Sequence, residues 1–464
     1  MSEEMKALRE QLLRNDKNGY DTLDEAQLAE MEAYCADYKA FLNEGKTERL
    51  SARAAIAAAE AKGFVQYKRG MALKAGDKVY TCNRGKGLML AVIGKESLAE
   101  GAQIAAAHID SPRLDLKPTP LYEDSEMAYF KTHYYGGIRK YQWVTIPLQL
   151  RGVVAKKDGS VVDVCIGEAG EPRLVITDLL PHLGGEQGRK PLNEAVPGET
   201  LNLLVGSRPI GDSEDKDRVK LHVMKRLHDK YGITESDFAS AELEAVPAAE
   251  AVDIGIDGSM IGSYGHDDRV CGYAALRALL DIETPDKTAV CVLADKEEIG
   301  SMGVTGMQSA AFDAFMSDLC DGQNVPLKAC FENAFCLSAD VTAAYDPNFA
   351  DVYEKKNAAF VNYGVGICKY TGARGKSGSS DANAETVAYV RAVLDGAGVR
   401  WQICELGKID AGGGGTVAQY MANRNIATLD AGVPVLSMHA PFEVVAKVDC
   451  YEMYRACKAL YEAR

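Results

Sequence analysis

The stretch Ala289-Val-Cys-Val-Leu-Ala-Asp-Lys-Glu-Glu-Ile-Gly300 decides the fold class, because an apolar run turns abruptly into charge. Residues 289–294 are short, apolar and rich in valine, which predicts a buried strand. Beyond residue 254, runs of this kind recur between helical segments. Strands are predicted at 335–341, 360–368, 401–405 and 433–438, and helices at 271–281, 384–394 and 449–462. This alternation predicts an α/β sheet.

The N-terminal part of the chain supplies more of this sheet, and the middle of the chain interrupts it. Helical spacing occurs at 23–43 and 51–62, and apolar runs at 88–93 and 103–107 predict strands, the second leading directly into His108. From about residue 141 to 205, β-branched runs alternate with turn signals, which predicts a β-rich module. Candidate metal ligands lie on both sides of this block. We therefore expect it to be an insertion into one discontinuous α/β domain.

Composition excludes several classes of function. The 464 residues are 47% hydrophobic and 26% charged, as in a globular protein large enough for two domains. A net charge of −15 argues against nucleic acid or an anionic membrane as a partner. The charged N-terminal region has no signal or transit pattern, and no apolar run approaches the roughly 20 residues of a membrane span. Twelve scattered cysteines without a CxxC pair are typical of buried thiols in a reducing compartment, so we expect a cytoplasmic protein.

Five short segments hold an unusual share of the ionisable residues, and nearly all of them follow an apolar run. In open α/β sheets, ligands bind beyond the carboxyl ends of the strands, which is where these residues are expected. The segments are Ala107-His-Ile-Asp-Ser-Pro112, Gly265-His-Asp-Asp-Arg269, Ala294-Asp-Lys-Glu-Glu-Ile-Gly300, Ser338-Ala-Asp-Val341 and Ser437-Met-His-Ala440.

Taken singly, most of these segments also have a purely structural interpretation. His108 and Asp110 fit a loop histidine beside a capping aspartate, and Asp267-Asp268 fits a helix N-terminus. The pair Glu297-Glu298 is more informative, because adjacent carboxylates after a buried strand repel each other unless a cation or a shared proton offsets the repulsion. Together, two histidines and several carboxylates are the mixed ligand set of a zinc or related metal site.

In this order, the segments resemble the aspartyl aminopeptidase family of metallopeptidases, and Asp340-Val-Thr-Ala-Ala-Tyr-Asp-Pro-Asn-Phe is similar to its vacuolar aminopeptidase I branch. The resemblance runs through most of the chain. It implies a metal-dependent aminopeptidase with two divalent ions per chain, zinc foremost, with cobalt and manganese also tolerated. The implied ligands are Asp268 bridging both ions, His108 and Asp340 at one ion, and Glu298 and His439 at the other.

The same resemblance assigns roles to two further carboxylates and to the inserted block. Asp110 would orient His108, and Glu297 would be the general base. A zinc-exopeptidase-like catalytic domain with a central mixed sheet would comprise residues 1–110 and 254–464, and residues 111–253 would form a β-rich dimerisation domain. Members of the family commonly assemble as tetrahedral dodecamers built from dimers. His182 is similar to a family histidine that reaches the active site of a neighbouring subunit.

The implied substrates are peptides, and two glycine-rich segments are candidates to contact them. Backbone amides in residues 371–383 and around Gly413-Gly414 can approach a substrate closely, although mobile surface loops are the alternative. An acidic N-terminal side chain would require a cation such as Arg374 or Lys376, whereas a neutral one would require an apolar pocket. The preferred N-terminal residue stays open.

The expected chemistry is hydrolysis assisted by two metal ions. Ions about 3.5–4 Å apart lower the pKa of a bound water toward about 7 and polarise the scissile carbonyl, while Glu297 accepts the proton and passes it to the leaving amine. Two alternatives stay open. One is a related two-metal amidohydrolase, deacylase or carboxypeptidase. The other is a catalytically silent assembly or cargo protein on the same scaffold.

Overall fold

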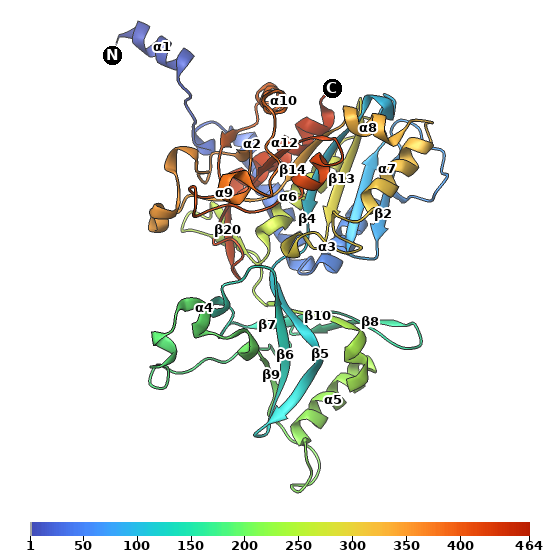
Figure 1. Cartoon of the computed structure of the whole chain (residues 1–464), viewed down its shortest axis with the longest axis vertical. Helices are drawn as coiled ribbons and strands as arrows, with labels where there is room; N and C mark the ends of the chain where they lie inside the picture. Colours follow the sequence, from blue (N-terminus) through green and yellow to red (C-terminus); the bar gives the residue numbers. More distant parts are fainter. Residues whose placement is uncertain (1) are drawn as a thin grey trace.

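The computed structural model describes residues 2–464 as two bodies joined at a narrow neck (Figure 1). The upper body in this view contains both ends of the chain and a large sheet with its helices. The lower body contains a second sheet, the helix α5 (Arg218–Tyr231) and the short helix α4 (Leu192–Ala195).

The upper body is organised on a mixed sheet that has nine strands in the part of the chain described. Their order is β1 (Val65–Gln66), β2 (Lys78–Asn83), β3 (Gly87–Val92), β13 (Thr288–Ala294), β4 (Ala102–His108), β14 (Phe335–Ala339), β18 (Ala427–Gly432), β16 (Val365–Cys368) and β17 (Trp401–Ile403). The central strands β13, β4, β14 and β18 run parallel to one another, whereas β3 and β16 run antiparallel to β13 and β18. The carboxyl ends of the central strands therefore meet at one edge.

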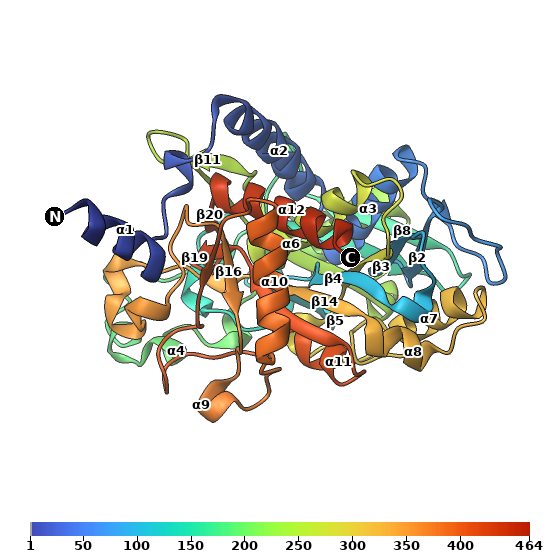
Figure 2. The ribbon, with the colours of Figure 1, turned by 90° about the horizontal axis from the view of Figure 1, so that it is seen from above.

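Helices cover both faces of this sheet because its central strands are apolar on both sides. Cys291 and Leu293 face one core, and Val290 and Val292 face the other. The first core is closed by α2 (Glu25–Glu44), α3 (Glu48–Ala61), α6 (His266–Leu280), α10 (Ala384–Gly396) and α12 (Lys447–Glu462), and the second by α7 (Ala311–Asp321), α8 (Leu327–Asn333) and α11 (Ala418–Ala422), as Figure 2 shows. No helix among residues 2–464 is both long and apolar enough to cross a membrane.

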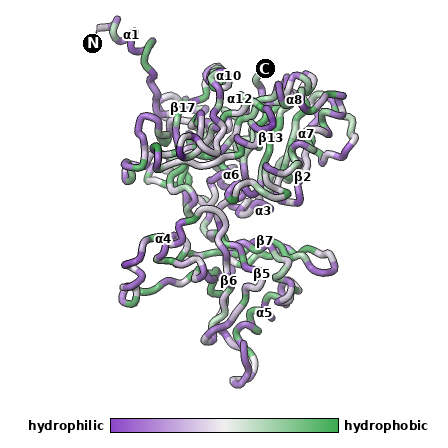
Figure 3. The backbone as a smooth tube through the Cα atoms, in the orientation of Figure 1, coloured by the Kyte–Doolittle hydropathy of each residue, from purple (hydrophilic) through white to green (hydrophobic). Residues whose placement is uncertain are grey.

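The lower body is built on an antiparallel sheet. Its strands, in order, are β8 (Val161–Ile166), β7 (Leu148–Ala155), β10 (Ala241–Pro247), β5 (Arg113–Asp124), β6 (Met127–Tyr135) and β9 (Leu203–Gly206). Every pair of neighbours is antiparallel. Val219 and Leu227 of α5 pack into its core beside the fully buried Trp143. Hydrophilic colour gathers on the outer loops, for example the loop below α5 in Figure 3.

A third, smaller sheet brings distant segments to the start of α6. It joins β11 (Val252–Ile254), β12 (Met260–Ser263), β20 (Glu443–Ala446), β19 (Pro434–Leu436) and β15 (Thr342–Ala343). Strand β12 leads into α6, and it pairs with β20, which follows the turn that carries His439. This pairing places His439 beside the first turn of α6.

The predicted α/β fold class is confirmed, with differences in detail. The lower sheet runs from Arg113 to Pro247, inside the segment expected to be inserted, and the domain limits at residues 110 and 253 stay a prediction. Within the β-rich block, the apolar residues 143–146 form no strand; they are a bent loop whose Trp143 lies in the lower core. The strand expected from residue 360 begins only at Val365. The sequence did not predict α1 (Glu3–Leu12), which projects from the upper body (Figure 1).

Candidate metal centre

Three strand ends bring most of the predicted site residues to one edge of the large sheet. Strand β4 ends at His108, and its parallel neighbours β13 and β14 are followed by Glu297-Glu298 and Asp340. Because the carboxyl ends of parallel strands meet at the same edge, these side chains converge. Asp267, in the first turn of α6, and His439, in the turn between β19 and β20, complete the group.

Asp267 lies between the two histidines. Its Oδ1 atom is 3.2 Å from Nε2 of His108, and its Oδ2 atom is 3.1 Å from Nε2 of His439. Burial opposes ionisation of this carboxyl, but hydrogen bonds from His108 and His439 hold its pKa below the usual value. An ionised carboxylate with one oxygen toward each histidine has the geometry of a ligand shared by two cations.

Asp268, predicted as the shared ligand, does not lie between the two histidines, and Asp267 occupies that position instead. Oδ2 of Asp268 accepts a hydrogen bond from the backbone N–H of His108 at 3.3 Å, in a fully buried position. Burial raises the pKa of Asp268 well above its usual value. The physical reason for the exchange is that both aspartates have non-helical backbone angles at the start of α6, so that their side chains point to different sides.

Each histidine has a second carboxylate nearby. Oε2 of Glu298 is 3.5 Å from Nε2 of His439, and Oδ1 of Asp340 is 3.9 Å from Nε2 of His108. Burial raises the pKa of Glu298 and of Asp340 well above the usual value, and repulsion from Asp267 and from Asp268, respectively, raises it further. Two groups result, each with ligand atoms within 4.8 Å of one another: His108, Asp267 and Asp340, and Asp267, Glu298 and His439.

Glu297 faces the same space but belongs to neither group. Its Oε2 atom is 3.9 Å from Nε2 of His108. Burial raises the pKa of its carboxyl to about 7. A carboxyl that titrates near neutrality is suited to accept a proton and return it.

Asp110 connects His108 to the loop that carries the two glutamates. Its carboxylate lies 3.3 Å from Nδ1 of His108, and its backbone carbonyl lies 3.0 Å from the same nitrogen. The backbone N–H groups of Glu297 and Glu298 each donate to this carboxylate at 3.2 Å, and the hydroxyl of Tyr135 donates at 2.8 Å. Asp110 therefore fixes the ring of His108 and the start of the glutamate loop together.

Glu443 was missed by the sequence reasoning. Its two carboxylate oxygens accept hydrogen bonds from the backbone N–H of Asp267 at 3.1 Å and from that of His439 at 2.7 Å. Its side chain is buried and connects the two segments that carry these ligands. One sequence feature could have indicated this role: Glu443 is an acidic residue at the start of the apolar run Glu443-Val-Val-Ala446, four residues after His439.

Comparisons with known proteins agree with this geometry. The sequence model of the family described as aminopeptidase I zinc metalloprotease (M18) matches residues 41–461. The chain belongs to the M18 aminopeptidase family. A probable M18 family aminopeptidase 1 of Clostridium acetobutylicum is 48% identical over 450 residues, which cover 95% of this chain and 97% of that protein. A probable M18 family aminopeptidase 1 of Thermotoga maritima is 44% identical over 439 residues, which cover 93% of this chain and 96% of that protein.

Solved structures of M18 aminopeptidases are also similar to this chain. The crystal structure of the M18 aminopeptidase of Thermotoga maritima aligns with a TM-score of 0.93 at 42% identity and covers 97% of this chain and 99% of that chain. That of aminopeptidase I of Clostridium acetobutylicum has a TM-score of 0.91 at 45% identity, covering 97% and 100%. The resemblance stated from the motifs is thus confirmed. The protein is a metal-dependent aminopeptidase, a hydrolase, and the family description supports zinc as its metal.

The donor atoms of this M18 aminopeptidase fit such a metal. Imidazole nitrogens and carboxylate oxygens are the ligands that zinc takes in catalytic sites. Within the described chain, Oε1 of Glu298 is buried and has no hydrogen-bond partner, although the other oxygen of this carboxylate faces His439. Buried carboxyls crowded in this way are stabilised by cations, because a cation offsets both their desolvation and their mutual repulsion.

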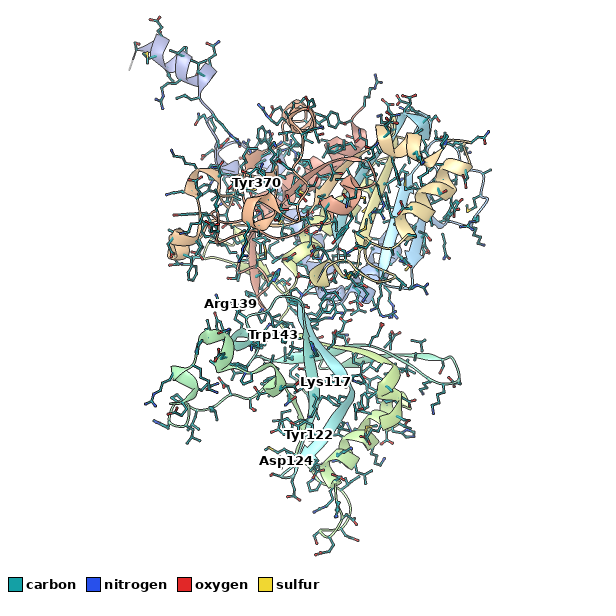
Figure 4. All side chains as sticks on the ribbon, in the orientation of Figure 1. Lys117, Tyr122, Asp124, Arg139, Trp143 and Tyr370 are labelled. Carbon is teal, nitrogen blue, oxygen red and sulfur yellow. The ribbon has the colours of Figure 1, made fainter. Side chains whose placement is uncertain are left out.

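The predicted substrate loops of the M18 aminopeptidase lie against each other. Gly413 adopts φ +124°, and a Cβ there would lie 2.6 Å from the Cα of Ala373 in the short helix α9 (Ala373–Lys376). The amide of Gly414 donates to the carbonyl of Thr371 at 3.1 Å. Both loops line a cavity of about 210 Å³, together with Tyr370, whose place in the upper body is shown in Figure 4. Glycine is required where the two backbones approach this closely.

Lys376 and His182 are not joined to the carboxylates of the metal centre by any ion pair in the described residues. Lys376 pairs instead with Asp381 at 2.9 Å and lies 3.8 Å over the ring of Tyr370. His182 is exposed in a loop of the lower body, before α4. Their roles toward substrate stay predictions.

Proposed function

We propose that this M18 aminopeptidase holds two divalent cations that share Asp267. His108 and Asp340 would complete one site, and Glu298 and His439 the other. The observation that carries this proposal is the carboxylate of Asp267, whose oxygens lie 3.2 and 3.1 Å from nitrogens of two different histidines. Zinc suits this mixed donor set, and cobalt or manganese would be accepted by the same ligands.

Hydrolysis then depends on Glu297. When bound, the cations lower the pKa of a water molecule toward about 7 and polarise the peptide carbonyl. Glu297 accepts a proton from the attacking water and returns it to the leaving amine as the peptide bond breaks. The carboxyl of Glu297, whose Oε2 atom lies 3.9 Å from Nε2 of His108, is placed for both steps. Asp110 holds His108 in one orientation throughout.

The glycine-rich loops are proposed to bind the peptide substrate. Backbone amides around Gly413 and Gly414 would contact the peptide, and Lys376 would lie beside its N-terminal residue. The cavity that these loops line contains cationic side chains, but it also contains Glu405 and Asp410. Its mixed charge favours neither an acidic nor a neutral N-terminal residue.

Assembly is proposed from structural similarity, and location from the cysteines. We propose that the lower body is a dimerisation domain and that dimers build a tetrahedral dodecamer. The mApe1 of S. cerevesiae, described as a dodecamer, shares this fold with a TM-score of 0.75 at 20% identity. The exposed loop position of His182 would allow it to reach a neighbouring subunit. All twelve cysteines are free thiols, which supports the cytoplasm as the location.

The function is tested with a panel of aminoacyl-p-nitroanilides on the wild type and on Glu297→Gln. Glutamine keeps the size of the side chain but cannot accept the proton, so we expect turnover to fall by roughly 10²–10⁴-fold while bound metal is retained. The exposed Glu332→Gln is the matched control. Undiminished turnover would remove Glu297 from the mechanism. N-acetylated substrates should not be cleaved, and their rapid hydrolysis would favour a deacylase or another amidohydrolase.

A further inference from the structure

The segment Tyr135-Gly136-Gly137 connects the lower body to the metal centre of the same chain. Tyr135 is the last residue of β6, and the chain then turns at the neck, near Arg139 in Figure 4, before it returns to the lower body at Trp143. One of its atoms contacts His439 directly, and another contacts Asp110, which in turn contacts His108. The hydroxyl of Tyr135 donates to Oδ2 of Asp110 at 2.8 Å, and the carbonyl of Gly137 lies 2.7 Å from Nδ1 of His439.

The glycines allow this backbone to lie directly on the ligands. Gly136 has φ +72°, and a Cβ there would be 3.3 Å from the Cβ of Glu298 and 3.4 Å from its Oε2. A Cβ on Gly137 would be 3.3 Å from Nδ1 of His439. Because Gly137 approaches so closely, its carbonyl receives the Nδ1–H of His439. This hydrogen bond orients the ring so that Nε2 faces Asp267.

Tyr135 is held firmly enough to orient Asp110. The residue is 7% exposed, and the guanidinium of Arg113 lies 3.8 Å over its ring. Asp110 in turn receives the backbone N–H groups of Glu297 and Glu298 and contacts Nδ1 of His108. The hydroxyl of Tyr135 connects the lower body to this carboxylate. It donates to Oδ2, the same oxygen that accepts the backbone N–H of Glu298.

We propose that Tyr135 is a positioning residue for peptide hydrolysis, acting through Asp110 on His108 and on the Glu297 loop. The lower body thereby contributes to the active site of its own chain, independently of any role in assembly. This inference rests on the proposed ligand set and on Glu297 as the base. It assigns catalytic importance to one hydroxyl whose removal leaves the aromatic ring and its contact with Arg113 in place.

The test compares Tyr135→Phe with Tyr134→Phe, which removes the hydroxyl of the exposed neighbouring tyrosine. In Tyr135→Phe we expect kcat for the aminoacyl-p-nitroanilide that the wild type cleaves fastest to fall by about 10–100-fold, the range typical of residues that orient a metal ligand, with KM changed by less than about twofold. Metal content at saturating zinc and the thermal midpoint should stay close to wild type. The visible bands of the cobalt-substituted enzyme should shift, because the orientation of His108 changes. Tyr134→Phe should match the wild type in all five measurements.

Two results would overturn the inference. One is wild-type kcat in Tyr135→Phe. The other is a loss of activity that vanishes when kcat is expressed per folded, metal-loaded subunit and leaves the cobalt spectrum unchanged, since that describes a purely structural role. Asp267→Asn in the same assay separates this inference from the proposed site. If Asp267→Asn is inactive and Tyr135→Phe is fully active, only the role of Tyr135 fails. If Asp267→Asn keeps its metal and its activity, the ligand set itself fails.

Discussion

Asp267 and Asp268 are neighbours in the chain, yet their carboxylates face different partners. Asp267 places one oxygen toward Nε2 of His108 and the other toward Nε2 of His439, at 3.2 and 3.1 Å. Asp268 turns back to the backbone amide of His108 at 3.3 Å. One of the two therefore lies between the two histidines, and the other supports the strand end from which His108 projects.

This difference predicts opposite outcomes for two conservative substitutions. Asp267→Asn removes the shared charge, so we expect the variant to lose at least one cation. Its turnover should fall by more than about 100-fold, which exceeds the loss typical of residues that act through a ligand. Asp268→Asn keeps an oxygen that can accept from His108, and burial already favours the neutral form of Asp268. Its turnover should stay within about tenfold of wild type. Metal analysis and kinetics of both variants check this, and equal losses would contradict it.

The sequence predicted the edge of the sheet but not the direction of each side chain. An apolar run followed by charge identifies a strand end, and parallel strand ends meet, so His108, Glu297-Glu298 and Asp340 were correctly expected to converge. The choice between Asp267 and Asp268 depends on backbone angles in the first turn of α6, which neither residue type determines.

Contacts from separate sheets were beyond the reach of sequence patterns. Tyr135 ends a strand of the lower sheet and has no neighbouring motif, so nothing in its surroundings indicates that it donates to Asp110. Glu443 stood next to a recognised segment, but its two hydrogen bonds depend on the pairing of β12 with β20. Long-range pairing of this kind is fixed by packing rather than by local propensity.

Glu443→Gln should weaken metal binding without removing a ligand. Glutamine keeps one acceptor oxygen, but its amide N–H₂ would face the other backbone N–H, so the amide of Asp267 or of His439 loses its partner. We expect the affinity for zinc to fall by about 10–100-fold and activity to recover at high zinc. Titration of the metal-free protein measures this change. An affinity equal to that of the exposed control Glu332→Gln would contradict it.

Removal of the metal should destabilise the fold as well as abolish activity. The proposed metal site exists only where folding gathers the buried carboxylates, so a metal at a thousandfold excess over its dissociation constant should stabilise the folded state by about 4 kcal/mol. For a chain of this size, that corresponds to a fall in Tm on the order of 4 °C after chelation. Calorimetry with and without a chelator measures the shift. Asp267→Asn should respond less to the chelator, and an equal response would argue against Asp267 as a shared ligand.

Asp430 should make the stability of the wild type depend on pH. Burial raises the pKa of its carboxyl to about 6, and the hydroxyl of Thr416, a neutral group, donates a hydrogen bond to it at 2.7 Å. Between about pH 4 and 6 the unfolded chain loses this proton while the folded chain keeps it, so this contribution to the free energy of unfolding falls as pH rises, by about 3 kcal/mol in total. Asp430→Asn cannot titrate and should lack that fall. Urea unfolding at pH 4, 5, 6 and 7 measures the difference between the two proteins, with the exposed Asp321→Asn as the control. A difference that is constant across this range would show that Asp430 is ionised in the folded state throughout.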